Sequence, residues 1–198
     1  IKKTETVGYI GRFQISEIPL EIQNLLSFGL TKIQSDGTPT AGIASRWIVE
    51  DDGKSYTFFL RDDLFWHDGS KVSSSDINYN FQDVSVEKPD SKTIRFRLKE
   101  PFSPFLEVVS RPVFKKSFLG LGTYKIQKIT RSGQFVETIS LLSREADKPN
   151  LKFRFYPTEQ AAKIGFKLGE VQKIVNLLDK SGFENWKGVK TTATVSYT

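Results

Sequence analysis

The chain has 198 residues, of which 38% are hydrophobic, 13% aromatic and 26% charged, and its formal net charge is +6. This composition is typical of a globular protein and excludes disordered, collagen-like and coiled-coil chains. The chain contains one histidine and no cysteine or methionine, which excludes disulfides and thiolate chemistry.

The N-terminal residues predict a strand, a loop and a helix. Thr4 to Ile10 has strand character, and the loop from Gly11 to Ile18 that follows has no helix or strand pattern. Pro19 opens a helix in which Ile22, Leu25 and Leu26 share one face, and Gly29 is placed to end it.

The middle of the chain predicts mainly β structure. Residues 47–49 and 56–60 flank the Asp52-Gly53 pair, which tolerates the positive φ of a tight hairpin turn. Ser73 and Asp76 fit a capping box, which predicts a short helix to about Phe81. Residues 93–98 alternate between apolar and polar side chains, as a half-buried strand does.

The C-terminal part predicts strands followed by helices. The strands are expected at 124–129, 135–142 and 151–156, and Thr158 caps a helix to about Leu168. A second helix is expected from an apolar stripe over 171–178, and a last strand at 190–197. Because this strand has no turn after it and the chain starts with Ile1, we expect a processed product cut in the middle of the fold.

Several motifs occur in an order that resembles one family. They are Ser27 to Leu30, Asp36 to Pro39, Ala44 to Trp47, Asp52 to Asp62, Phe65 to Gly69, Val72 to Tyr79, Thr93 to Phe96, Pro101 to Leu106, Gly120 to Tyr124 and Lys167 to Val171. Together they resemble the extracytoplasmic solute-binding proteins of ABC importers, in the peptide, nickel and oligopeptide-binding group. Gln172 departs from the family pattern, which usually has Asp there, and family members are typically more than twice as long.

The resemblance implies a mixed α/β (α+β) fold, the lobe of a periplasmic-binding-protein-like clamshell. Lobe I is expected from residues 1–45 and 119–198, with a small β-rich subdomain inserted at 46–118 and the second lobe absent. The implied function is capture of a solute, most simply an oligopeptide, between two lobes and its delivery to permease subunits of an ABC transporter. The implied location is extracytoplasmic, in the periplasm or lipid-anchored on the outer face of the cell membrane.

Candidate ligand-binding residues come from loops at strand ends, where ligands settle in open α/β sheets. By resemblance, the loop after the first strand lines the cleft floor and supplies Gln14, Ser16, Glu17 and Ile18. Glu17 suits a cationic group such as a peptide amine, while an ordinary polar loop is the alternative. Tyr79 matches a family tyrosine that faces the cleft. The Arg111 to Phe114 stretch, with Pro112 and Phe114 as candidates, either borders the crevice or is a plain connecting loop.

Other functions receive little support from the sequence. His67 lacks the further histidines or cysteines that a metal site of protein side chains requires, and no cofactor motif is present. Adjacent Asp62 and Asp63 point to opposite faces of a strand end, so no paired catalytic carboxylates are predicted, and no enzyme is expected. Period-2 alternation explains the basic and aromatic residues at 152–156 better than nucleic-acid binding does. A nickel chelate, an oligosaccharide, or an adhesion or scaffold role stays open.

Overall fold

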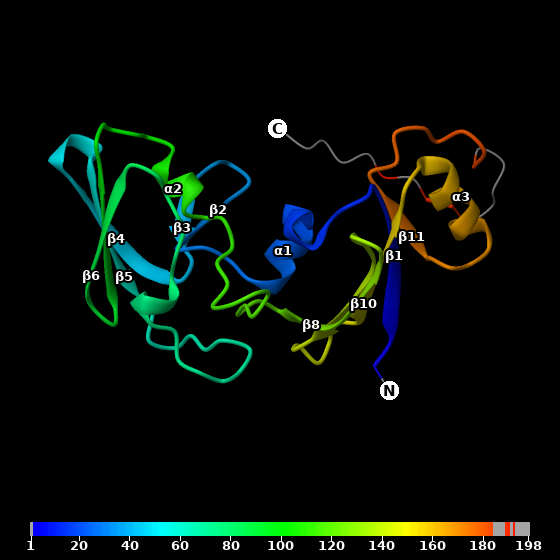
Figure 1. Ribbon diagram of the computed structural model, residues 1–198, viewed down its shortest axis with the longest axis horizontal. Helices are drawn as coiled ribbons and strands as arrows, with labels where there is room; N and C mark the ends of the chain where they lie inside the picture. The colour runs from blue at the N-terminus through cyan, green and yellow to red at the C-terminus, as the bar shows by residue number, and fades with distance from the viewer. Residues whose placement is uncertain (1, 184–188, 191, 193–198) are drawn as a thin grey trace.

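The computed structural model describes residues 2–183, 189–190 and 192. The molecule is elongated, with one β-sheet at each end of its long axis and a short helix, α1, between them (Figure 1). None of the helices in the described residues has the length and apolar character needed to cross a membrane.

The larger sheet is mixed and has the strand order β11-β1-β10-β9-β8. β1 pairs in parallel with both β10 and β11, whereas β8, β9 and β10 pair antiparallel. The bounds are Thr4–Ile10 for β1, Tyr124–Ser132 for β8, Phe135–Ser143 for β9, Asn150–Tyr156 for β10 and Lys173–Val175 for β11.

Helices cover opposite faces of this sheet because neighbouring strand residues point to opposite sides. Val7 and Tyr9 of β1 belong to the same buried cluster as Ile22 and Leu26 of α1 (Leu20–Leu26). On the other face Tyr156 packs in a smaller cluster with residues of α3 (Glu159–Lys167). The Thr158 side chain accepts a hydrogen bond from the Ala161 amide and caps α3, as predicted.

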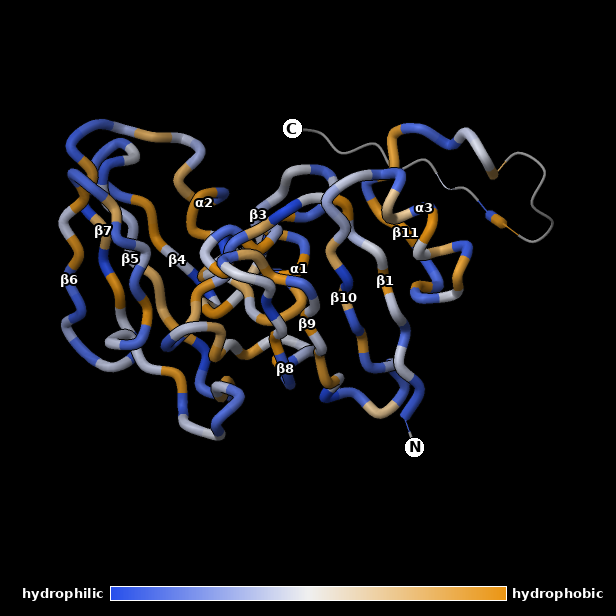
Figure 2. The backbone as a smooth tube through the Cα atoms, turned by 45° about the vertical axis from the view of Figure 1, so that its right-hand side comes forward, coloured by the Kyte–Doolittle hydropathy of each residue, from blue (hydrophilic) through white to orange (hydrophobic). Residues whose placement is uncertain are grey.

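The smaller sheet is antiparallel, in the order β4-β5-β7-β6. Hydrophobic and hydrophilic residues alternate along its strands (Figure 2). Its apolar face carries Phe58 and Ile94, which are fully buried and belong to one core cluster with Trp66. A two-stranded hairpin and a short helix complete this body. The bounds are Ala44–Glu50 for β4, Ser55–Leu60 for β5, Val84–Asp90 for β6, Thr93–Leu98 for β7, Thr31–Ile33 for β2, Pro39–Ala41 for β3 and Phe105–Val108 for α2.

The two bodies meet through close backbone contacts. A Cβ on Gly29 would overlap the Val109 carbonyl oxygen and lie 2.6 Å from the Ser110 carbonyl oxygen. A Cβ on Gly120 would likewise overlap the carbonyl oxygen of Leu26. These positions therefore need glycine because another segment's backbone passes against them.

The mixed α/β fold class and most predicted strands are confirmed. The hairpin turn uses positive φ at Asp51, Asp52 and Gly53. The predicted boundaries of the discontinuous lobe (1–45 and 119–198) and the insertion (46–118) stay a prediction. The strand expected at 190–197 lies outside the described residues, apart from Lys190 and Thr192.

The helix expected after the capping box is wrong. The Ser73–Asp76 box forms, but it caps a single 3-10 turn over Ser74–Asp76, and Ile77 is already extended. Asn80 has a φ of 53°, and Ile77, Tyr79 and Phe81 all pack on the core of the smaller sheet. The chain therefore follows a two-residue period here, which places the side chains of Ile77, Tyr79 and Phe81 on one side.

The helix expected over 171–178 is also wrong. Val171 packs beneath the sheet edge, and residues 173–175 form β11 beside β1. Asn176 then turns with a φ of 61°, and the Glu159 carboxylate accepts hydrogen bonds from the amides of Leu178 and Asp179. The apolar stripe reflects the packing of a short, β-branched edge strand, which sequence periodicity does not distinguish from a buried helix segment.

Two smaller corrections concern the N-terminal region. α1 ends at Leu26 with Ser27 as its C-cap, so Gly29 serves the backbone contact described above and does not end the helix. The loop after β1 contains a 3-10 turn over Ile15–Glu17, in which the Gln14 amide donates to the Glu17 carboxylate.

Candidate functional site

A cleft of about 770 Å³ opens between α1, β2 and the loops that join the two bodies. Its volume lies in the range of pockets that take small-molecule ligands. Its wall is formed by Leu20 and Asn24 of α1, by Ser27 and Phe28, by Lys32 and Ile33 of β2, and by residues 110–112, 121–123 and 144–145.

The helix wall follows from the amphipathic pattern of α1. Ile22 and Leu26 are fully buried on the sheet, so Leu20 and Asn24, four residues apart, lie together on the other face and border the cleft. The start of the helix is fixed by the Gln23 side chain, which donates to the Ile18 carbonyl at 2.7 Å.

The β2 wall places a cation beside an aromatic ring. Thr31 is buried and donates through its hydroxyl to the Leu106 carbonyl, so the next residue, Lys32, points to the opposite side. The Lys32 ammonium lies 4.1 Å from the centre of the Phe28 ring. This cation–π contact holds the charge at the cleft without neutralising it.

The third wall is a pair of hydrogen-bonded loops. The Arg144 amide donates to the Thr123 carbonyl at 2.9 Å, and the Thr123 hydroxyl donates to the Glu145 carboxylate at 2.8 Å. Lys148 forms an ion pair with Glu145 at 2.7 Å. The pKa of Glu145 lies below its ordinary value, mainly because of the Lys148 hydrogen bond and then that of Thr123, so the carboxylate is ionised and already paired.

His67 supports this wall from behind. Its Nε2 lies 3.0 Å from the Gly122 carbonyl, and its backbone amide donates to the Gly120 carbonyl. Burial lowers the pKa of His67, and the positive charges of Arg144 and Lys125 lower it further, against the opposing effect of the Gly122 hydrogen bond. The neutral ring therefore acts as a structural donor to the loop.

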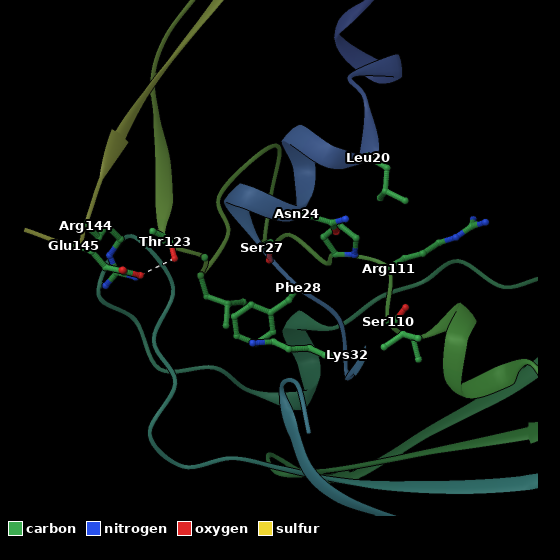
Figure 3. Close-up of a pocket in the computed structure, with 14 residues that line it drawn as sticks. Leu20, Asn24, Ser27, Phe28, Lys32, Ser110, Arg111, Thr123, Arg144 and Glu145 are labelled. Atoms are coloured by element: carbon green, nitrogen blue, oxygen red, sulfur yellow. Dashed lines mark hydrogen bonds between the residues drawn. The ribbon is translucent and has the colours of Figure 1, made fainter. Parts of the chain in front are cut away.

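Of the predicted ligand-binding residues, Pro112 lines the cleft. Phe114, two residues on, packs edge-to-face against Phe118 at 5.4 Å and belongs to the core of the larger sheet. Arg111, the residue before Pro112, also lines the cleft, and its side chain points away from Thr123 (Figure 3).

The predicted residues of the loop after β1 lie outside this cleft. Gln14, Ser16 and Glu17 are exposed, whereas Ile18 is buried in the core of the larger sheet. Their role in ligand binding stays a prediction.

Tyr79 bridges two backbone segments. Its hydroxyl donates to the Val109 carbonyl at 2.6 Å and accepts from the Leu30 amide at 3.0 Å. Burial raises the pKa of Tyr79, and the ring stacks on Phe81. Its hydroxyl is thus engaged within the protein, and its contact with a ligand stays a prediction.

Sequence reasoning missed several cleft residues, namely Asn24, Phe28, Lys32, Thr123 and Arg144. Phe28 and Thr123 lie within motifs noted for their family resemblance, which was the available signal. Lys32 and Arg144 carry no sequence signal, because an exposed basic residue looks the same on any surface. Among the described residues there is no group of three or more metal-ligating side chains of the His, Cys, Asp and Glu types.

Comparison with solved structures finds proteins of the same fold. It superposes on NikZ from Campylobacter jejuni, solved in complex with Ni(L-His), with a TM-score of 0.70, 24% identity, and coverage of 86% of this chain and 43% of NikZ. It superposes on DppA from Helicobacter pylori, solved with the peptide STSA, with a TM-score of 0.65, 18% identity, and coverage of 86% and 46%. DppA is described as an ABC transporter-associated periplasmic binding protein, and this chain has the fold of part of these two structures.

Sequence comparison finds a partial match to one protein family. Residues 38–85 match the model of bacterial extracellular solute-binding proteins, family 5, and the dipeptide-binding protein DppE of Bacillus subtilis is 28% identical over 137 residues. That match covers 53% of this chain and 25% of DppE, so the chain spans less than half the length of these relatives. Over residues 38–85 the chain is thus similar to the family 5 solute-binding proteins.

Proposed function

We propose that this chain forms one half of the solute-binding component of an ABC importer. The observation that carries the proposal is the 86% coverage of this chain by solved binding proteins of which it spans less than half, together with the family match at 38–85. In such proteins a hinge allows two lobes to close on a ligand. The cleft between α1, β2 and the 121–123 loop is the contribution of this half to the ligand site.

The proposed ligand is a short peptide. DppE is named for dipeptide binding, and DppA was solved with a four-residue peptide, so two relatives support this class. The cleft of about 770 Å³ has room for a peptide of this size, and its mixture of apolar, amide and charged side chains suits a peptide with varied side chains.

A nickel chelate is the second candidate. The likeness to NikZ, which was solved with nickel bound by histidine, favours it. Since the described residues contain no cluster of metal-ligating side chains, the metal would arrive with its own small-molecule ligands, and the cleft would hold the organic part.

The proposed setting is the outer side of the cell membrane. The family is described as extracellular, and an importer requires permease subunits to receive the solute. We propose that the half of the relatives that this chain does not cover supplies the opposing lobe and most of the remaining ligand contacts. This setting also makes nucleic acid an unsuitable partner.

Isothermal titration with a mixture of di- to pentapeptides tests the proposal. The 198-residue chain alone is expected to bind more weakly than micromolar, because one lobe cannot enclose the ligand. The chain extended to the full length of its relatives is expected to bind at micromolar affinity or tighter. Micromolar binding by the chain alone would contradict the two-lobe proposal. An extended protein that binds Ni(L-His) and no peptide would replace the peptide by the chelate.

A further inference from the structure

Three basic side chains line the cleft without a carboxylate partner. Lys32, Arg111 and Arg144 all border it, and within the described part of the chain none of them lies within 4.0 Å of a carboxylate oxygen. Nearby cations behave differently. Lys115 pairs with Asp68 at 3.4 Å and Lys148 with Glu145 at 2.7 Å.

Glu145, the one carboxylate among the described residues that line the cleft, does not neutralise them. Glu145 is engaged by Lys148 and by the Thr123 hydroxyl, so its charge is compensated on the side of the loop. Arg144, Glu145 and Thr123 group at one side of the cleft, Lys32 lies beside Phe28 in the middle, and Arg111 points away on the far side (Figure 3). Because Arg111 points away, Lys32 and Arg144 are, in the part of the chain that the structure describes, the two remaining unpaired charges on the lining of the cleft.

Lys32 is positioned but keeps its hydrogen-bond donors. The Phe28 ring, 4.1 Å away, attracts the ammonium through its π face and accepts no conventional hydrogen bond. An ammonium has three N–H donors, and a charge-assisted bond to an oxyanion is about twice as strong as a neutral one. Phe28, Ile33 and Leu121 supply apolar lining to the same cleft.

Arg144 contributes a second positive charge at a fixed backbone position. Its amide is bonded to the Thr123 carbonyl, so the residue is anchored to the 121–123 loop. The field of this charge reaches through the loop: after burial, Arg144 is the larger of two cations that lower the pKa of His67 behind Gly122. The lining of the cleft therefore carries two positive charges, on Lys32 and Arg144, that have no carboxylate partner among the described residues.

We infer that Lys32 and Arg144 form a subsite for the carboxylate of an anionic solute, so that this protein takes acidic peptides or small organic acids. The inference rests on the proposed function, which sets the size of the solute, and it specifies in addition that the solute is negatively charged. The apolar lining and the volume of about 770 Å³ favour an organic acid over a bare oxyanion such as inorganic phosphate, which would fill little of the cleft.

A pair of isosteric peptides tests the charge directly. The probes are Ala-Glu-Ala amide and Ala-Gln-Ala amide, which differ by one carboxylate, with succinate and inorganic phosphate as further arms. Chemical-shift titration of the ¹⁵N-labelled 198-residue chain detects millimolar binding, so weak affinity of a single lobe is measurable. We expect the Glu peptide to bind about tenfold tighter than the Gln peptide, as expected for a hydrogen-bonded charge pair. The largest shifts are expected at the amides of Lys32, Gly122 and Thr123.

Charge-removing variants locate the subsite. Lys32→Gln and Arg144→Gln are each expected to lower the preference for the Glu peptide to about twofold or less. Both residues are exposed, and unchanged spectra away from the cleft verify that the variants fold. Lys128→Gln is the matched control: it removes the same charge from an exposed site on β8 outside the cleft, and the preference should remain.

The outcomes separate the inference from the proposed function. Equal binding of the two peptides overturns the carboxylate subsite and leaves the solute-binding proposal standing. Equal loss of preference in Lys128→Gln would also overturn it, because the effect would then be one of net charge. Tighter binding of phosphate than of the Glu peptide or succinate would replace the organic acid by a bare oxyanion. Failure of the proposed function would appear separately, as absence of peptide and chelate binding in the extended protein.

Discussion

Replacement of Gly29 by alanine tests the view that backbone contact, and not helix termination, requires glycine at this position. A Cβ at residue 29 would overlap the Val109 carbonyl oxygen and lie 2.6 Å from that of Ser110. Since both obstacles are backbone atoms, no side-chain rotation can relieve the clash. The two segments must separate by close to an ångström to restore ordinary contact distances.

The expected cost follows from the hydrogen bonds across this contact. The Leu30 amide donates to the Val109 carbonyl at 2.8 Å, and the Val113 amide donates to the Phe28 carbonyl at 3.2 Å. Weakening these bonds costs about 1 kcal/mol each, and overpacking adds about 1 to 3 kcal/mol. We therefore expect Gly29→Ala to lower the free energy of unfolding by about 3 to 5 kcal/mol.

Urea denaturation followed by tryptophan fluorescence measures this loss. The matched control is Gly133→Ala in the β8–β9 turn, where φ is 59° and a Cβ would have no neighbour within 4 Å. The control should lose only the cost of a left-handed alanine, about 1 to 2 kcal/mol. If Gly29→Ala lost no more than the control, the close-contact explanation would be refuted.

Two further predictions concern the cleft's supports. Tyr79→Phe removes the hydroxyl that joins Leu30 to Val109, and it should lower the unfolding free energy by about 1 kcal/mol while peptide affinity of the extended protein stays unchanged. A loss of affinity at unchanged stability would instead support the predicted ligand contact. Because the folded state lowers the pKa of His67, the unfolded chain binds more protons below about pH 6.5. Urea titrations should thus show stability falling from pH 7.5 to 5.5, and this slope should flatten in His67→Gln; an equal slope in the variant would contradict the assignment.

Local chemistry made much of the fold predictable. The β4–β5 turn, the Thr158 cap and the Ser73–Asp76 box depend on residues within four positions of one another, and all three form. Strands with clean alternation, such as β7, were predictable for the same reason. β6 was not, because it contains Pro89, which has no N–H to donate. Pro89 fits because β6 is an edge strand and its pairing with β7 is interrupted between Glu87 and Asp90.

The failures share a cause, which is that the deciding partners lie far away in the sequence. Residues 173–175 become a strand because β1, more than 160 residues earlier, offers a free edge, and residues 77–81 extend along a core that includes Phe96 and Phe105. The cleft was hidden for the same reason. Lys32 and Arg144 border one cavity although they are separated by most of the chain, and nothing local to either residue predicts that they share it.

The glycine contacts also limit how far the walls of the cleft can move. Gly29 and Gly120 bring backbone segments of the two bodies together, and a Cβ on Gly122 would lie 2.6 Å from the carbonyl oxygen of Leu25 in α1. Because these contacts join backbone atoms, no side-chain rotation can absorb a displacement. The walls of the cleft therefore cannot slide past one another without breaking hydrogen bonds; these walls are residues 27–33, 110–112 and 121–123. The cleft is consequently preformed in this half. Under the proposed function, enclosure of a solute would come from movement of the proposed opposing lobe as a unit. Residues of this cleft would then govern which solutes are selected more than how fast the protein closes.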